Sequence, residues 1–256
     1  MGIFSSNKKA EENFDDFPAI GGIMASKLVT EENLKPLFMY REKRTNPQDS
    51  GWRIFSGQES QDYTDNPENA GIYNPSTILK IDSSLKELLL KGVGSVFERE
   101  SEKSEWYVVN DYELEDDYLV KHRLTEDWIL EINNLFERTK EDSGDLLYTT
   151  GDRSLRIAIW NDKGKNRQQI YDEHETQIRR RDQSEAKTLN TFEFSDSNIK
   201  RIGYEIVEKN ESKEYKVIYA FSFIDERILQ MAFYFDNDED REWAIQTWKN
   251  ITTEEK

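Results

Sequence analysis

The sequence predicts an α+β protein of two domains, each with a mainly antiparallel sheet and one or two helices. Three observations support this prediction. The chain has 256 residues, whereas an average domain has about 150. Its apolar residues occur mostly in short runs separated by glycine, proline, asparagine and aspartate, as in strands joined by turns. Only a few segments show the spacing of an amphipathic helix, so helices are expected to be in the minority.

The first predicted domain covers residues 18–112 and follows a polar segment, residues 1–17, which we expect to be a mobile tail. Turn residues separate its apolar runs, and Asp49-Ser50-Gly51 is one of these predicted turns. Ser84 predicts the start of a short helix that ends at Gly92. The apolar runs predict strands at residues 22–29, 36–41, 52–55, 96–97 and 106–109.

Residues 113–145 are predicted to form an acidic connector followed by a helix. Trp128, Ile132 and Phe136 are four residues apart, so they would share one face of a helix. Thr125 and the two carboxylates after it fit the start of this helix, where the helix dipole favours negative charge.

The second predicted domain covers residues 146–256. Alternating apolar residues predict a strand at 155–159, and a charged helix is predicted to follow and to end near residue 181. Asp238 is expected to cap a last helix that buries Ala244, Trp248 and Ile251. The segment 225–227 has only three residues, so it is short enough to join two strands as a hairpin. Four further strands, which form an antiparallel meander, are predicted at 192–194, 202–207, 215–224 and 228–235.

The charge of the chain limits its partners. Asp and Glu number 52 against 35 Lys and Arg, which leaves a formal net charge of −17. A field of this sign repels nucleic acids and anionic membranes, so neither is an expected partner, whereas a basic protein is attracted. No apolar run approaches the about 20 residues needed to cross a bilayer. Because the chain also lacks cysteine, as is typical of reducing compartments, we expect a cytoplasmic protein. The oligomeric state is left open.

The motifs of common active sites are absent from the sequence. Its two histidines, His122 and His174, lie outside any His-Glu-x-x-His zinc motif, and there is no Gly-x-Ser-x-Gly or Gly-Lys-Ser/Thr motif. Asp236, Asp238 and Asp240 begin like a calcium loop but lack its glycine and glutamate at positions six and twelve. We therefore predict a protein that is not an enzyme, with no catalytic residue, no metal site and no cofactor.

An acidic segment that also carries tyrosines is the strongest candidate for a partner-binding surface. Tyrosines serve as interface anchors, and carboxylates steer a cationic partner. The alternative is a connector between domains whose apolar residues pack inward. The candidate residues are Tyr112, Glu113, Glu115, Asp116, Asp117 and Tyr118.

Five short segments follow one another in the first predicted domain, at residues 23–27, 39–42, 49–57, 77–79 and 93–99. This ordered series, over about residues 20–110, resembles immunity protein family thirty-three, a former domain of unknown function from bacterial polymorphic toxin systems. We expect the motif residues to serve the fold, with Trp52 and Phe55 in the core and Arg41 paired with Glu42. The motif residues are Ser26, Lys27, Tyr40, Arg41, Glu42, Asp49, Ser50, Gly51, Trp52, Arg53, Ser56 and Gly57.

The resemblance implies a cytoplasmic antitoxin that binds and blocks a cognate toxin protein and has no catalytic activity of its own. A basic nuclease is the kind of toxin that the net charge favours. Two other functions stay open. One is a regulatory or scaffolding module that binds a small ligand or peptide, with its pocket between the domains. The other is a metal-assisted hydrolase that uses paired carboxylates.

Overall fold

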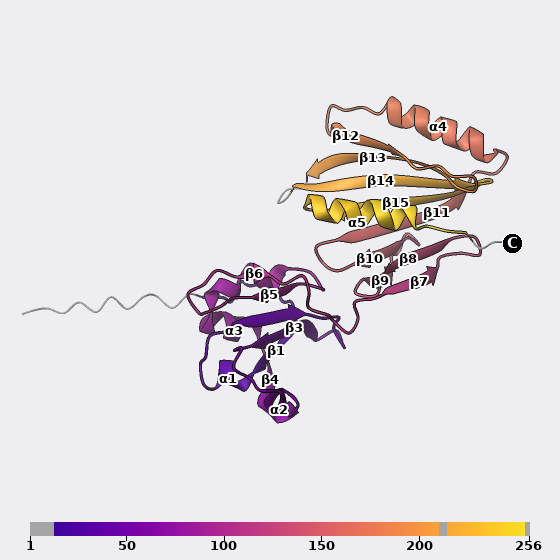
Figure 1. The fold of residues 1–256 in the computed structure, drawn as a ribbon. Coiled ribbons are helices and arrows are strands. Elements are labelled where there is room, and N and C mark those ends of the chain that lie inside the picture. The colour runs from indigo at the N-terminus through magenta and orange to yellow at the C-terminus, as the bar shows by residue number, and fades with distance from the viewer. Residues whose placement is uncertain (1–12, 210–213, 254–256) are drawn as a thin grey trace, which may run out of the picture. The chain divides into compact units, whose positions relative to one another are not determined.

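The computed structural model describes residues 13–209 and 214–253. The chain forms two compact units, residues 1–114 and 115–256 (Figure 1). Both units combine mainly antiparallel sheets with a few helices, so the predicted α+β fold class is confirmed.

The first unit is built on a six-stranded sheet with the strand order β4-β1-β3-β2-β5-β6. Strands β1 and β3 pair in parallel, and the other neighbours are antiparallel. The strands are β1 (Gly22–Ser26), β2 (Phe38–Arg41), β3 (Asp49–Phe55), β4 (Ala70–Tyr73), β5 (Val96–Glu98) and β6 (Tyr107–Val108). The helical segments are α1 (Lys27–Thr30), α2 (Gln61–Thr64), η1 (Pro67–Asn69), α3 (Pro75–Ile81), η2 (Ser83–Leu85) and η3 (Leu88–Leu90).

One face of this sheet packs on helical segments and forms the core of the first unit. Successive side chains of a strand point to opposite faces, so Trp52 and Ile54 of β3 lie in this core and Arg53 lies on the other face. Both core residues are fully buried together with Leu79 of α3 and Leu89 of η3. The Trp52 indole Nε1–H donates to the Leu89 carbonyl oxygen at 3.0 Å, which satisfies its buried donor.

Two predictions for the start of the first unit are wrong in part. Residues 1–12 of the predicted mobile tail lie outside the described residues, but Phe14 and Phe17 pack against the core. The Asp49-Ser50-Gly51 segment is not a separate turn but the first part of β3, where the pairing with β1 is irregular. Gly51 has a φ of 80°, as a glycine in a β-bulge does. Residues that are typical of a turn therefore form a bulge inside a strand.

The helices of the first unit differ from the prediction. The segment from Ser84 to Gly92 forms two short 3-10 turns, η2 and η3, instead of one helix. Helix α3 was not predicted, because Asn74-Pro75 reads as a loop. In the structure Pro75 is the first residue of α3, a position where its missing N–H costs nothing.

The second unit is built on a seven-stranded antiparallel sheet with the order β12-β13-β14-β15-β11-β10-β9, and on a two-stranded sheet, β7-β8. The predicted hairpin between β14 and β15 is present, with Ile224 opposite Arg227. The strands are β7 (Leu119–Arg123), β8 (Ile129–Asn133), β9 (Glu137–Lys140), β10 (Leu146–Thr149), β11 (Ser154–Asn161), β12 (Thr188–Glu193), β13 (Lys200–Lys209), β14 (Glu214–Ile224) and β15 (Arg227–Phe235). The helices are α4 (Arg167–Arg179) and α5 (Asp238–Lys249).

The two helices of the second unit cover opposite faces of the large sheet. Phe223 of β14 packs with Ile170 of α4, whereas its neighbour Ser222 accepts a hydrogen bond from the Trp248 indole of α5 at 2.9 Å. Because adjacent residues of a strand point to opposite faces, α4 and α5 enclose the sheet between them.

The helix predicted from Thr125 onward is wrong. Residues 129–133 and 137–140 are strands β8 and β9. Trp128, Leu130 and Ile132 are all fully buried in the core of the second unit. Their spacing of two residues fits a strand, and positions 128, 132 and 136 also fit this period because four is a multiple of two. Residues 115–145 are therefore part of the second unit and not a separate connector.

Replacing Gly51 by alanine is expected to lower the free energy of unfolding by about 2 kcal/mol or more. The φ of 80° disfavours any side chain, and a Cβ atom would overlap the carbonyl oxygen of Glu42. Urea unfolding followed by tryptophan fluorescence measures the effect. Gly57→Ala is the matched control: its φ is 77°, but the nearest atom is the Leu37 side-chain Cβ at 3.2 Å, so about 1 kcal/mol is expected. Equal losses in the two variants would contradict the role of the overlap.

Candidate functional site

The face of the first sheet that points away from its core carries a cavity of about 1100 Å³, which we call the sheet pocket. Strands β1 to β5 supply its floor, and residues of α2 and of the segment that follows supply a wall. Arg53 and Phe55 of β3 line the pocket, whereas Trp52 and Ile54 between them do not. The alternation of one strand thus builds both the core and the pocket.

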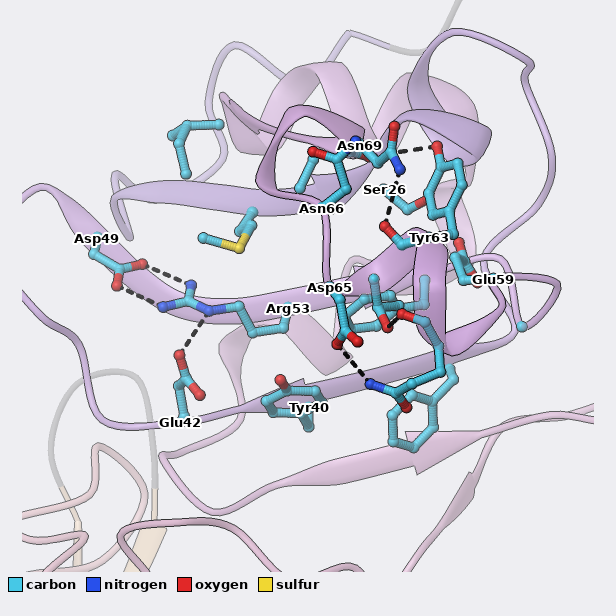
Figure 2. A pocket seen from close by; sticks show the side chains of 18 of the residues that line it. Ser26, Tyr40, Glu42, Asp49, Arg53, Glu59, Tyr63, Asp65, Asn66 and Asn69 are labelled. Atoms are coloured by element: carbon cyan, nitrogen blue, oxygen red, sulfur yellow. Dashed lines mark hydrogen bonds and ion pairs between the residues drawn. The ribbon is translucent and has the colours of Figure 1, made fainter.

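A buried arginine and two carboxylates form one end of the sheet pocket (Figure 2). The side chain of Arg53 is only 6% exposed. Its Nη2 donates to Asp49 Oδ2 at 2.8 Å, and its Nε donates to Glu42 Oε1 at 2.7 Å. A buried cation is stable only when it is paired and hydrogen-bonded, and these two carboxylates meet that requirement.

The same contacts set the pKa values at this end of the sheet pocket. Hydrogen bonds from the Arg53 guanidinium hold the pKa of Asp49 well below its usual range, although partial burial opposes this. Burial also opposes the charge of Arg53, but hydrogen bonds and charge from Asp49 and Glu42 outweigh it and raise the pKa of Arg53. Both members of the pair are therefore ionised at neutral pH.

Aromatic rings also line the sheet pocket. The ring centroids of Phe38 and Tyr112 are 5.2 Å apart, as are those of Tyr40 and Tyr112. Phe55 stacks on Tyr40 with centroids 6.0 Å apart. Burial, with Tyr112 and Glu42 close by, raises the pKa of the Tyr40 hydroxyl. This hydroxyl stays protonated, so the negative charge of the pocket comes from carboxylates.

The other end of the sheet pocket is polar, and Ser26, Glu59, Tyr63 and Asn69 lie there (Figure 2). Glu59 Oε1 accepts hydrogen bonds from the backbone N–H of Ser56 at 2.8 Å and from its hydroxyl at 2.9 Å. Burial tends to raise the pKa of Glu59, but hydrogen bonds from Ser26 and Ser56 lower it overall. Glu59 is thus a fixed, ionised carboxylate.

The motif residues divide between the sheet pocket and the supporting structure. Ser50 is buried, and its hydroxyl donates to the Gly22 carbonyl oxygen at 2.7 Å. Arg41 donates to the Ser50 carbonyl and lies over the Trp52 ring. The residues outside the pocket lining are Lys27, Arg41, Ser50, Gly51, Trp52 and Ser56. Those in the lining are Ser26, Tyr40, Glu42, Asp49, Arg53 and Gly57.

The acidic segment predicted as a partner-binding surface is divided between the two units. Tyr112 lines the sheet pocket in the first unit, whereas Asp116, Asp117 and Tyr118 belong to the second unit. Asp116 accepts a hydrogen bond from Asn134 Nδ2 at 2.8 Å, and Asp117 accepts one from Asn133 Nδ2 at 2.6 Å. Glu113 and Glu115 are exposed.

Sequence reasoning missed several residues of the sheet pocket, including Glu42 as a partner of Arg53, and also Glu59, Asp65 and Glu98. Glu98 had a signal: it follows the core residue Phe97 in a strand, so it must face away from the core. Asp65 lies after α2, a helix of four residues, and its place in the pocket depends on the folded loop alone.

Residues 23–110 match the family model of the Immunity protein Imm33 domain. The family resemblance seen in the sequence is thereby confirmed for this part of the chain, and the match supports an immunity role with a toxin as partner. Every residue that lines the sheet pocket except Tyr112 lies within the matched segment.

The other comparisons carry no functional information. The chain is similar to cyanobacterial PsbP (CyanoP) from Synechocystis sp. PCC 6803, with 7% identity and a TM-score of 0.42 over 54% of this chain and 94% of that one. It is also similar to a crystal structure from Bacteroides thetaiotaomicron VPI-5482, with 8% identity and a TM-score of 0.38 over 50% of this chain and 46% of that one. No curated protein matches.

Two further features are absent from residues 13–209 and 214–253. None of the helices there is long and apolar enough to span a membrane. No group of three or more histidine, aspartate or glutamate side chains there could hold a metal ion.

Acid is expected to destabilise the first unit through Asp49. The pKa of Asp49 is lower in the folded than in the unfolded chain, so its charge stabilises the fold fully above about pH 4, and this contribution is lost as the pH falls through the folded-state pKa. Asp49→Asn should be less stable than wild type at pH 7 and should lose less stability between about pH 5 and 2. Urea unfolding across this pH range measures both effects.

Asp62→Asn is the matched control for this prediction, because Asp62 is exposed on α2. Its stability should follow the wild-type curve. If Asp49→Asn also followed that curve, Asp49 would not stabilise the fold through its charge.

Proposed function

We propose that this protein is an immunity protein that neutralises a cognate bacterial toxin by binding it, and that the sheet pocket is its contact surface. One observation carries the proposal: the segment that matches the immunity family supplies the pocket residues from Met24 to Glu98. The family match supports a toxin protein as the partner. Residues of the matched segment also form the concave surface of the pocket.

Binding, and not a reaction, is the role that we propose for these side chains. Asp49 and Glu42 are engaged by Arg53, and the Tyr40 hydroxyl keeps its proton. Fixed carboxylates and aromatic faces recognise cationic and apolar groups. The toxin would be inactivated because the bound protein covers its active site.

A basic nuclease is the toxin that we propose. Nucleases hold phosphates with cationic surfaces, and a chain with a net charge of −17 would associate with such a surface rapidly. The acidic segment at residues 112–118 would assist this encounter through Glu113 and Glu115. We propose a secondary role for it, because Asp116 and Asp117 already bond to Asn134 and Asn133.

Two pairs of neutral substitutions separate the two surfaces, because each pair removes the same charge. Asp65→Asn with Glu98→Gln alters the sheet pocket, and Glu113→Gln with Glu115→Gln alters the acidic segment. The pocket pair is expected to weaken toxin binding about tenfold or more, and the segment pair is expected to slow association by only about two- to threefold. Surface plasmon resonance against the cognate toxin domain measures the dissociation constant and the association rate constant.

Growth of cells that co-express toxin and wild-type protein tests the function itself. Failure of the wild-type chain to protect such cells would refute the immunity proposal. If protection and affinity were lost with the segment pair and kept with the pocket pair, the acidic segment would be the contact surface.

A regulatory module that binds a small ligand is the second candidate, and the volume of the sheet pocket favours it. Small-molecule sites usually have volumes of about 300–1000 Å³, and the sheet pocket, at about 1100 Å³, is close to this range. A thermal-shift screen with metabolites tests this candidate, which requires one compound whose stabilising effect is lost in the Asp65→Asn, Glu98→Gln pair.

A further inference from the structure

Building on the proposed function, we infer that the sheet pocket receives an arginine or lysine side chain from a basic loop of the toxin. The inference concerns the chemistry of the occupant and rests on three properties of the pocket: its charge, its aromatic faces and its size.

The sheet pocket has more negative than positive groups. The lining holds one guanidinium, that of Arg53, and five carboxylates: Glu42, Asp49, Glu59, Asp65 and Glu98. Arg53 is paired with the first two. Within the described part of the chain, the other three carboxylates take part in no ion pair. A concave surface concentrates such a field, so the pocket attracts a cation.

An anionic ligand has no free cationic partner among the residues that line the sheet pocket, because Arg53 is the only arginine or lysine there. Arg53 makes four hydrogen bonds, to Glu42, to both carboxylate oxygens of Asp49 and to the Trp52 carbonyl oxygen. With a side chain that is 6% exposed, the guanidinium is already satisfied inside the protein. The positive charge of Arg53 therefore organises the pocket and does not bind a ligand.

The aromatic rings favour an organic cation. A guanidinium or ammonium group binds over the face of a tyrosine or phenylalanine ring, and Tyr40, Tyr112 and Phe38 form a continuous aromatic group in the pocket. Tyr112 is 39% exposed, so its ring is accessible from outside. Asp65 and Glu98 in the same lining supply acceptors for the donors of the cation.

The size of the sheet pocket favours a side chain on a peptide loop over a bare ion. A volume of about 1100 Å³ holds a long side chain together with its neighbouring residues. No carboxylate cluster in residues 13–209 and 214–253 could hold a metal ion. Charge, aromatic faces and volume therefore agree on a basic segment of the partner.

The test uses the full chain and hexa-arginine amide as the probe, with affinity measured by isothermal titration calorimetry at low and high salt. Asp65→Asn with Glu98→Gln should weaken peptide binding about tenfold. Tyr112→Leu removes a ring without changing the charge and should weaken binding about two- to fivefold. Circular dichroism melts establish that the variants are folded.

Matched controls separate the sheet pocket from the general negative charge of the chain. Glu126→Gln with Glu239→Gln removes the same charge at exposed positions of the second unit, and Trp160→Leu removes a ring that is 38% exposed. Both should keep the affinity within about twofold of wild type. Equal losses in pocket and control variants, or no loss in the pocket variants, would overturn the inference.

The peptide-binding test and the immunity assay can give different results. If the chain protects cells from the toxin but the pocket substitutions leave peptide binding unchanged, the proposed function stands and this inference is wrong. Sedimentation that shows a dimer dissociated by the pocket substitutions would assign the sheet pocket to a second copy of the chain, which also overturns it.

Discussion

The ion pair of Arg53 with Asp49 and Glu42 is the interaction on which the first unit depends. It places a buried cation on β3, a central strand of the sheet. Its two carboxylates come from the first residue of that strand and from the residue that follows β2. Removing one partner would leave an uncompensated charge in a poorly solvated place, which costs far more than the loss of a surface pair. The pair also determines which pocket carboxylates are left for a partner.

Strand alternation explains why one short sequence builds both the core and the sheet pocket. In β3, Trp52 and Ile54 enter the core while Arg53 and Phe55 enter the sheet pocket. The family motif therefore includes both core residues and pocket residues. Trp52 packs in the core, whereas Arg53 lines the sheet pocket. The prediction that Phe55 joins Trp52 in the core is wrong, because residues three apart in a regular strand point to opposite faces and Phe55 lines the sheet pocket.

Much of the fold was predictable because it depends on local patterns. The β14–β15 hairpin and helices α4 and α5 show clear periods in the sequence, and the structure contains them. The helix expected after Thr125 failed because a spacing of four residues suits both a helix and a strand. The sheet pocket was not predictable, because Asp65, Glu98 and Tyr112 are brought to Arg53 by the pairing order of the strands and by loop structure.

The position of Tyr112 has a consequence for how such proteins diversify. This ring lies just past residue 110, where the family match ends, yet it completes the aromatic group around Tyr40. Recombination at this junction would exchange one wall of the sheet pocket while the matched segment stays intact. The lining of the pocket can therefore change through what is joined to the domain, without any substitution inside it.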